Sequence, residues 1–319
     1  MKEIAVGVDI GGTYTKYGFV DKEGVVLAAG SIETTGHADV EAYQVALKDA
    51  IEEKKNSLSE NIKIVGVGIG APNGNYYSGT IEQAPNLSWK GVVPFIELFK
   101  KHYDVPMALT NDANSAAIGE MLFGGAKGMK NFIVITLGTG LGSGIVVNGE
   151  LVYGHDGFAG ELGHVTIVRG GRQIPTGRRG SLEGYVSAPG ICRTVFELMA
   201  EMIVDSEFRN IPYNKLTAKM VYEGALKGDP IAVEAFERTG KYLGEALSDT
   251  VMHLSPEAIF VFGGLASAGE FILNPTKKHM EDNLLPIFKN KVKILPSGLT
   301  ETNAAVLGAS ALVWQEISQ

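Results

Sequence analysis

The first thirty residues contain three short apolar segments separated by turn-forming residues. These segments cover residues 4–10, 16–20 and 25–30, with Gly11–Gly12 and Asp21–Gly24 between them. Apolar runs of this length, bounded by glycine and aspartate, are typical of β-strands joined by hairpins. The pattern therefore predicts an antiparallel meander at the start of the chain.

The same order of elements returns near the middle of the chain. Residues 133–152 again contain an apolar strand, a glycine turn, a second apolar strand, a hairpin tip and a third strand. Repetition at this spacing predicts two related halves, one in each of two domains. The remaining pattern predicts strands over 64–72, 107–111 and 258–264, and helices over 38–56, 92–102, 188–203, 215–227, 230–253, 266–284 and 302–316.

Length and composition agree with an α/β protein of two domains. A chain of 319 residues is long for one compact core, and 45% hydrophobic with 20% charged residues is ordinary for a folded soluble protein. We expect a small N-terminal domain of residues 1–116 plus 303–319 and a large C-terminal domain of residues 117–302. The hinges are expected near 114–120 and 300, and the last helix should cross back to the first domain.

Charge and cysteine content exclude several classes of partner. A net charge of −8 argues against a surface that neutralises nucleic-acid phosphates, which needs clustered cations. A single cysteine, Cys192, forms no internal disulfide and no thiolate metal site by itself, as expected in a reducing compartment. The sequence shows no signal-peptide pattern and no apolar stretch near the ~20 residues of a membrane helix. We therefore expect a cytoplasmic protein with no nucleic-acid or membrane partner.

The first glycine turn, in "DIGGTYTKYG" (9–18), has the chemistry of an anion site. It lacks the Walker and GxGxxG patterns, and it opens a strand where a Walker loop opens a helix. Its glycines can expose backbone N–H groups to an anion. A carboxylate at Asp9 would repel a phosphate unless Mg²⁺ lay between them, so the combination suggests a nucleotide with Mg²⁺.

Two further apolar strands end in glycine. They lead into "LGTGLGSG" (137–144) and "FGG" (262–264). Each turn taken alone is better explained as a plain glycine hairpin. Three such turns together favour a nucleotide cleft between sheets.

Asn111 and Asp112, in "LTNDANSAAIGE", lie where a strand hands over to a helix. For Asp112 in isolation, the simpler explanation is a helix N-cap. However, α/β sheets place their ligands at the carboxyl ends of strands. There the carboxylate could accept the proton of a hydroxyl that attacks phosphorus.

Five motifs in this order carry a resemblance to a known family: "DIGGTYTKYG", "NDANSAA", "TLGTGLGSGIVVNGELVYG", "GFAGELGH" and "GSLEGY". The chain, from residue 4 to about 312, resembles the ROK family of repressors, open reading frames and sugar kinases, and within it the glucokinases. The resemblance implies an α/β fold of two ribonuclease H-like domains, of the actin and hexokinase type, with a cleft between them. It also implies ATP and Mg²⁺ as cofactors and a homodimer.

The resemblance assigns roles to the matching positions. Asp112 resembles the catalytic base, and Asn111 a partner of the same sugar. The groups that would bind the sugar are Asn86, Asn111, Asp112, Glu161, His164 and Glu183. The residues that would bind the nucleotide are Asp9, Gly11, Gly12, Thr13, Lys16, Gly138, Thr139, Gly140, Gly263 and Gly264. For Glu161, His164 and Glu183, the simpler alternative is an exposed group in a surface ion pair.

The segment "ELGHVTIVRGGRQIPTGRRGSLEGY" (161–185) departs from the family pattern. Relatives hold this loop with a structural zinc bound by the histidine and three cysteines, but Ile174, Thr176 and Ser181 stand at the cysteine positions. None of them replaces a thiolate, and structural zinc sites are closed sets of four ligands. We therefore expect no zinc and no other protein-bound metal.

Without zinc, the remaining polar residues of this loop need other partners. The second ring nitrogen of His164 would need one such as a backbone carbonyl. Arg169, Arg172, Arg178 and Arg179 are expected to be solvated, although one could pair with Glu183 or reach the ATP side.

We expect an ATP-dependent hexose kinase that phosphorylates the 6-hydroxyl of glucose, with Asp112 as general base. Other acceptors within the family are N-acetylmannosamine, N-acetylglucosamine, fructose and allose. A sugar-responsive repressor is the alternative from another class, but those carry an N-terminal helix-turn-helix, and only Met1–Glu3 precede the first strand here. A sugar-binding protein that lost catalysis is a third possibility.

Overall fold

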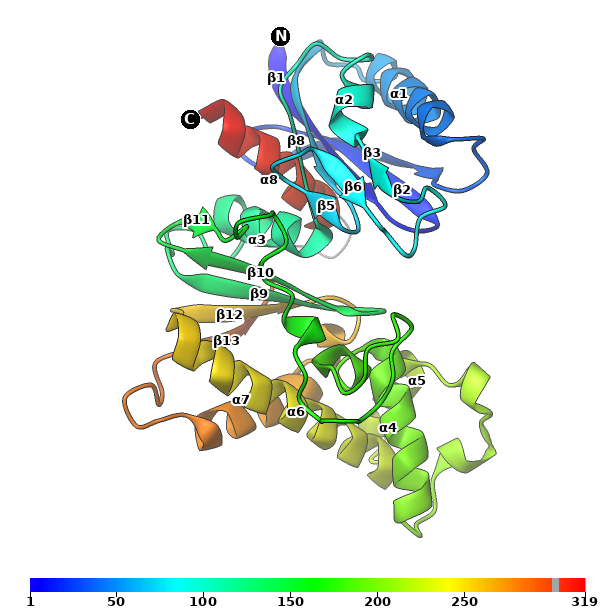
Figure 1. Ribbon diagram of the computed structural model, residues 1–319, viewed down its shortest axis with the longest axis vertical. Coiled ribbons are helices and arrows are strands. Elements are labelled where there is room, and N and C mark those ends of the chain that lie inside the picture. Colours follow the sequence, from blue (N-terminus) through cyan, green and yellow to red (C-terminus); the bar gives the residue numbers. More distant parts are fainter. Residues whose placement is uncertain (300–303, 319) are drawn as a thin grey trace. The chain divides into compact units, whose positions relative to one another are not determined.

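The computed structural model describes residues 1–299 and 304–318 and divides into two compact units (Figure 1). Unit 1 comprises Met1–Met129, Glu150–Ala159 and Ser297–Gln319, and unit 2 comprises Lys130–Gly149 and Gly160–Pro296. Unit 1 thus continues past the expected boundary at residue 116. Residues 300–303 lie outside the described part. They include or adjoin the expected boundary at 302–303, the hinge near 300 and the start of the last helix.

Unit 1 is built on a five-stranded sheet with the order β3-β2-β1-β4-β8. The first three strands pair antiparallel, which confirms the predicted meander, and β4 and β8 continue the sheet parallel to β1. The carboxyl ends of β1, β4 and β8 therefore share one edge. The strands are β1 (Lys2–Ile10), β2 (Tyr14–Val20), β3 (Val26–Glu33), β4 (Ile62–Gly70) and β8 (Met107–Thr110).

Helices cover both faces of this sheet. On one face, β1 buries Ile4, Val6 and Val8 in the cluster that contains Tyr43 and Leu47. The other face carries α3 and α8 (Figure 1). The helices of unit 1 are α1 (Val40–Asn56), α2 (Phe95–Phe99), α3 (Asp112–Leu122) and α8 (Ala304–Ser318).

Two glycines allow α8 to lie directly on the sheet. A Cβ atom at Gly7 would overlap the carbonyl oxygen of Val306, and one at Gly68 would overlap that of Ala309. Only glycine therefore fits at these strand positions without moving the helix. The packing of α8 on β1 and β4 confirms that the last helix returns to the first domain.

A small sheet in unit 1 was not anticipated from the sequence. Its order is β5-β6-β7, with both pairs antiparallel. Each strand has two or three residues, which is too short for apolar alternation to show. The strands are β5 (Gly74–Asn75), β6 (Thr80–Glu82) and β7 (Val92–Val93).

The sheet of unit 2 repeats the topology of unit 1. Strand β10 pairs antiparallel with β9, β12 runs parallel to β9, and β13 runs parallel to β12. The order β10-β9-β12-β13 thus matches β2-β1-β4-β8, which confirms two related halves. These strands are β9 (Phe132–Leu137), β10 (Leu141–Val147), β12 (Ala258–Phe262) and β13 (Lys293–Pro296); the short β11 (Glu150–Leu151) belongs to the segment of unit 1.

Four α-helices complete unit 2 and agree with the predicted ranges. Three of them begin after a side-chain cap, at Ser187, Thr217 and Asp229. They are α4 (Ala188–Glu201), α5 (Ala218–Leu226), α6 (Pro230–Leu254) and α7 (Glu270–Asn283). Short 3₁₀ helices occupy η1 (Leu162–His164), η2 (Leu182–Gly184), η3 (Glu207–Asn210), η4 (Tyr213–Lys215) and η5 (Ala266–Ala268).

No helix among residues 1–299 and 304–318 is both long enough and apolar enough to cross a membrane.

Candidate active site

In unit 1, the first glycine turn closes tightly after β1. The amide of Gly11 donates to the carbonyl of Tyr14 at 3.1 Å. A Cβ atom at Gly12 would lie 2.9 Å from the backbone oxygen of Asn86, so that turn and that loop touch. Thr13 is exposed beside them. The structure thus brings together three of the predicted groups, Gly11–Gly12, Thr13 and Asn86.

The capping role at the start of α3 belongs to Asn111 and not to Asp112. Asn111 is the N-cap, and its Oδ1 accepts the amide of Asn114 at 2.7 Å. Asp112 is the first helical residue, and its Oδ1 accepts the adjacent amide of Ala113 at 2.9 Å. The simpler explanation for Asp112 is therefore wrong. Asp112 as a whole residue remains solvent-exposed.

Asp9 and Asp112 form an acidic pair at the carboxyl edge of this sheet. Burial and, to a smaller extent, the charge of Asp112 raise the pKa of Asp9, and Lys16 lowers it; together they bring this pKa to about 6. Desolvation also raises the pKa of Asp112, against the hydrogen bond from Ala113, although this side chain keeps contact with solvent. Two carboxyls with raised pKa values at one edge are typical of functional sites and favour a shared cation.

Lys16 lies next to this pair through the sheet register. It is the antiparallel partner of Asp9 on β2, and its side chain is exposed. A cation here partly offsets the like charges of Asp9 and Asp112 and can also approach a phosphate.

In unit 2, the second glycine turn is attached to α4. The amide of Gly138 donates to the carbonyl of Gly140 at 2.9 Å, and the carbonyl of Gly138 accepts the amide of Ala188 at 2.8 Å. Thr139 is exposed at the tip. The turn is therefore hydrogen-bonded to the first residue of α4.

Glu183 lies directly on this turn. The amide of Leu141 donates to Glu183 Oε2 at 3.0 Å. A Cβ atom at Gly140 would overlap the same oxygen, so a larger residue there would displace the Glu183 carboxylate. A residue predicted to contact sugar and a residue predicted to contact phosphate thus touch each other.

The third glycine segment packs against the end of β9. Gly263 has φ +104°, a value that favours glycine, and its Cα faces the backbone of Leu137. The amide of Leu265 donates to the carbonyl of Leu137 at 3.1 Å. Leu137 immediately precedes the second turn, so the structure brings Gly263–Gly264 beside Gly138–Gly140.

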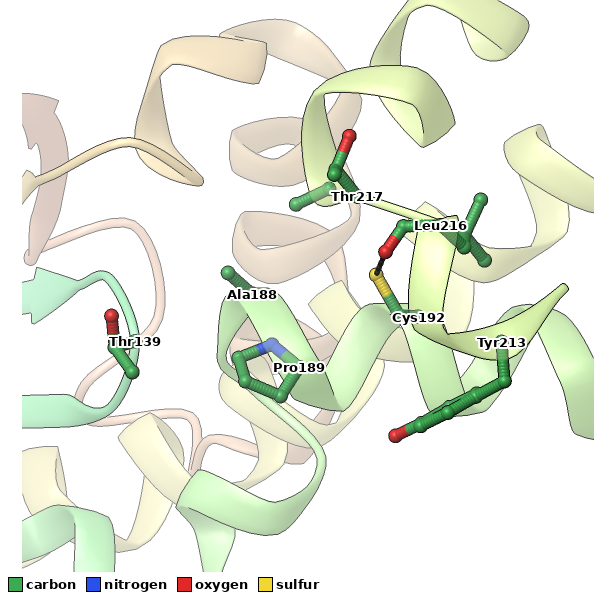
Figure 2. A pocket seen from close by; sticks show the side chains of 8 residues that line it. Thr139, Ala188, Pro189, Cys192, Tyr213, Leu216 and Thr217 are labelled. Atoms are coloured by element: carbon green, nitrogen blue, oxygen red, sulfur yellow. Dashed lines mark hydrogen bonds between the residues drawn. The ribbon is translucent and has the colours of Figure 1, made fainter. Parts of the chain in front are cut away.

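Two pockets of unit 2 open next to these glycines. Figure 2 shows the first, of about 330 Å³, with Thr139 facing Ala188 and Pro189. Its lining is Thr139, Ala188, Pro189, Cys192, Tyr213, Leu216, Thr217 and Ala218. The second, of about 290 Å³, is lined by Ala218, Lys219, Tyr222, Phe236, Gly264, Leu265, Ser267 and Ala268.

The two pockets share Ala218 and together extend from Thr139 to Gly264. A mostly apolar lining with a few polar groups suits a planar ring with a polar tail. Tyr213, Leu216 and Tyr222 of this lining lie in a region without a recognisable motif, so the sequence alone does not indicate them.

The segment that carries Glu161 and His164 is fixed by Ser143 of β10. Ser143 Oγ donates to the carbonyl of Gly160 and accepts the amide of Leu162 at 3.2 Å. The η1 and η2 helices pack together, and the amide of Leu182 donates to Val165 at 2.9 Å. His164 and Glu183 therefore lie in two adjacent short helices, and Glu161 immediately precedes the first of them.

His164 differs from expectation in one respect. Its Nδ1 atom is buried and has no hydrogen-bond partner in the described structure, so the expected backbone carbonyl is not there. The hydroxyl of Ser181, at one of the cysteine positions of the family, is likewise buried without a partner.

The side chains of this loop do not fit a zinc ion. Ile174 is an apolar side chain buried to 6% exposure, Thr176 is exposed, and Ser181 offers a neutral hydroxyl. In the described ranges, 1–299 and 304–318, no group of three or more histidine, cysteine or acidic residues could hold a metal. Thiolates are the ligands that such a closed site requires.

The arginines of the loop behave in two ways. Arg169, Arg178 and Arg179 are exposed, as expected. Arg172 is only 7% exposed, so the expectation that it is solvated is wrong. It pairs with Glu197 of α4, and not with Glu183.

The repeated sheet topology and the glycine turns at the strand ends define a protein of the actin- and hexokinase-like fold. Within that fold, the chain belongs to the ROK family, whose sequence profile matches residues 5–316.

Three relatives illustrate this membership. A glucokinase of Halalkalibacterium halodurans is 34% identical over 317 residues, covering 98% of this chain and 95% of the relative. The crystal structure of a ROK family glucokinase from Streptomyces griseus in complex with glucose and AMPPNP has a TM-score of 0.79 and 31% identity, covering 97% of this chain and 98% of that one. The xylose repressor of Bacillus subtilis is 26% identical over 313 residues, covering 97% of this chain and 76% of the repressor.

Proposed function

We propose that the protein is an ATP-dependent sugar kinase that transfers the γ-phosphoryl group of ATP to the 6-hydroxyl of glucose. The observation that carries this proposal is the state of Asp112. It follows a parallel strand, shares the sheet edge with the first glycine turn, is not needed as a helix cap and remains accessible. The similarity to glucokinases, one of them solved with glucose and AMPPNP, supports the same conclusion.

Asp112 would act as general base on the acceptor hydroxyl. A carboxylate in this position accepts the hydroxyl proton as the oxygen attacks the γ-phosphorus and the bond to the β-phosphate oxygen breaks. The raised pKa of Asp112 makes it a better proton acceptor than an ordinary aspartate, provided that it is ionised at the working pH. Most of the rate enhancement would come from positioning.

The polar side chains that the family pattern assigns to the sugar would bind it: Asn86, Asn111, Glu161, His164 and Glu183. Carboxylate, amide and imidazole groups can donate to and accept from several hydroxyls at once, which suits a hexose.

The glycine turns and the two pockets of unit 2 would bind ATP. Each turn would offer phosphate oxygens an exposed hydroxyl, Thr13 or Thr139, and the backbone of Gly12 or Gly140, while the amides of Gly11 and Gly138 close the turns themselves. Gly263–Gly264 and the adjoining pockets would hold the adenosine. Mg²⁺ would accompany ATP and neutralise phosphate charge, with Asp9 as the residue that faces it and Lys16 as a second positive charge.

Turnover across a sugar panel tests this function. We expect ATP consumption with glucose at a higher kcat/KM than with fructose, allose, N-acetylglucosamine or N-acetylmannosamine, and glucose 6-phosphate as the product. If another sugar of the panel gives a higher kcat/KM, that sugar and not glucose is the preferred acceptor. Absence of phosphoryl transfer to every sugar, in protein that binds ATP, would refute the kinase function.

A sugar-responsive regulator is the second candidate, because a xylose repressor matches nearly all of this chain. The same panel separates the two: a regulator binds sugar without consuming ATP.

We also propose a cytoplasmic homodimer. The single, buried thiol of Cys192 supports the location, and sedimentation velocity of the purified protein would measure the assembly.

A further inference from the structure

Residues 165–181, which join η1 to η2, have almost no regular structure of their own. Two isolated β-bridges, Thr166↔Ser181 and Gln173↔Arg179, are the backbone ladder contacts within this loop. Yet the loop leads into η2, which carries Glu183, and a fixed position of Glu183 matters in the proposed function. Something other than secondary structure must therefore hold its end in place.

A buried guanidinium does so. Arg172 Nη1 donates to the carbonyls of Gly184 and Gly190, both at 3.0 Å, and Nη2 donates to Thr194 Oγ1 at 2.9 Å. Nε donates to Glu197 Oε1 at 2.9 Å, and Nη2 also donates to Glu197 Oε2. Each of the five N–H groups of the guanidinium thus has an acceptor.

The ring of Tyr185 completes this arrangement. The guanidinium carbon of Arg172 lies 4.4 Å from the ring centroid, and the backbone amide of Arg172 donates to the Tyr185 hydroxyl at 3.0 Å. The loop is therefore attached at one residue to both η2 and the first turns of α4. Lysine, a point charge with three donors and no planar fork, cannot make the same set of contacts.

These contacts bear on Glu183. The carbonyl that Arg172 holds belongs to Gly184, the next residue, while Ser187 Oγ donates to the Glu183 carbonyl at 2.8 Å. Leu141 fixes the carboxylate from the other side. Removing the guanidinium would free the backbone immediately after Glu183. Glu183 would then keep only its hydrogen bonds with Leu141 and Ser187 among those of the described residues.

We propose that Arg172 is a positioning residue for the acceptor sugar: it anchors η2 to α4 so that Glu183 keeps its place against the sugar hydroxyls. The anchor is a side chain of the chain itself, in a loop whose residues do not fit a metal. This inference rests on the proposed kinase function and adds to it a residue that does not touch the substrate.

The test uses Arg172→Met, which keeps an unbranched apolar side chain and removes every donor of the guanidinium. Arg178→Met and Arg179→Met are matched controls, because both arginines lie in the same loop and are exposed. We expect Arg172→Met to raise the KM for glucose about 10- to 100-fold, as misplacement of a binding group does, with the KM for ATP changed less than about twofold. The control variants should keep the wild-type KM for glucose and for ATP. Arg172→Lys should have a KM for glucose between those of the wild type and Arg172→Met.

Hydrogen–deuterium exchange supplies a readout that does not depend on turnover. Peptides covering residues 182–187 should exchange faster in Arg172→Met, while peptides from β9 and α6 stay protected. If Arg172→Met does not fold, Thr194→Val and Glu197→Gln each remove one acceptor, and should raise the glucose KM and the exchange of 182–187 by smaller amounts.

Unchanged exchange of residues 182–187 in folded Arg172→Met would overturn the inference, whatever the activity. An equal rise in the KM for both substrates would also overturn it, because that indicates general disturbance. Failure of the wild-type protein to phosphorylate any sugar would refute the proposed function instead, so that the two failures are distinguishable.

Discussion

Among single residues, Asp112 carries the strongest prediction. The nearly isosteric substitution Asp112→Asn removes the proton acceptor and should lower kcat by about 10²- to 10⁴-fold while glucose binding stays within about threefold. Steady-state kinetics and calorimetric titration with glucose would measure both quantities. Asp104→Asn, at an exposed aspartate of the same unit, is the control. Near-normal turnover of Asp112→Asn would remove Asp112 from the base role.

Asp9 leads to a pH-dependent prediction. Its pKa is raised in the folded protein to about 6 from an ordinary value of 3.8, so the folded state binds its proton more tightly than the unfolded state does. Proton binding at Asp9 therefore contributes to the free energy of unfolding below pH 3.8, and this contribution is lost as the pH rises through about 6.

Below pH 4, Asp9→Asn should therefore have nearly the wild-type free energy of unfolding. As the pH rises to about 6, the variant should become more stable than the wild type, and above that pH the difference should stay constant. Denaturant unfolding of both proteins between pH 3.5 and 8, without nucleotide, measures this difference. A difference that does not change with pH would mean that Asp9 titrates normally. The same variant should bind Mg·ATP more weakly.

The residues of the candidate site differ in how well the sequence predicts them. Asp112 and the glycine turns belong to short contiguous motifs, so their local chemistry can be seen in the sequence. The role of Arg172 cannot, because its acceptors lie 12 to 25 positions further along the chain. An arginine in a glycine-rich loop suggests a solvated side chain until the fold places α4 beside it.

At the level of elements, the close packing of α8 on β4 predicts that two glycine-to-alanine substitutions on this strand lower the free energy of unfolding by different amounts. Gly68→Ala would place a methyl group on the backbone oxygen of Ala309, which cannot move without the helix. We expect a loss of about 1–3 kcal/mol or more in the free energy of unfolding, as for overpacking in a core.

Gly66→Ala is the matched comparison, because it lies on the same strand and mainly meets the side-chain ends of Val313 and Ile317. Those atoms can shift, so the loss should be smaller. Chemical denaturation of both variants gives the comparison, and equal losses would contradict the close approach at Gly68.

Glu120 of α3 holds together two segments of unit 1. Its buried carboxylate accepts the amides of Gly125 at 2.7 Å and Gly298 at 2.9 Å, and the hydroxyl of Ser297. Glu120→Ala leaves these donors without their acceptor, so we expect a loss of about 1–3 kcal/mol or more of stability. Thermal unfolding would measure it against Glu97→Ala, on α2, and equal losses would count against this role.

The long elements were predictable because their apolar periodicity extends over many residues. The long helices and the meander therefore agree with expectation, whereas the helix expected over 92–102 is only Phe95–Phe99, because Val92–Val93 pair as β7. The strands of the small sheet and β13 have two to four residues each, and such short segments carry no measurable period. Their existence depends on neighbouring strands that the local sequence does not specify.

For the whole molecule, the main prediction concerns zinc. Because the loop offers no thiolate and one histidine whose Nδ1 has no partner, purified protein should contain well under one zinc per chain, and EDTA followed by excess Mg²⁺ should leave activity unchanged. Elemental analysis and activity before and after chelation measure this. Stoichiometric zinc whose removal abolishes activity would refute the expectation.

The two related halves could be predicted from the sequence because the strand–turn–strand pattern occurs twice. The division into units could not be predicted as well, since the chain leaves unit 1 after Met129 and returns to it for only Glu150–Ala159. Boundaries of this kind depend on contacts between distant segments.

The contact between Glu183 and the second glycine turn also has a consequence for cooperativity between ligands. One carboxylate accepts the amide that follows Gly140 and, as proposed, contacts the sugar, so a phosphate at the turn and a hexose at Glu183 act on the same side chain. Their binding free energies are then coupled, and the coupling must be reciprocal. Whatever factor AMPPNP applies to the dissociation constant of glucose, glucose must apply to that of AMPPNP, and Glu183→Gln should bring that factor closer to one.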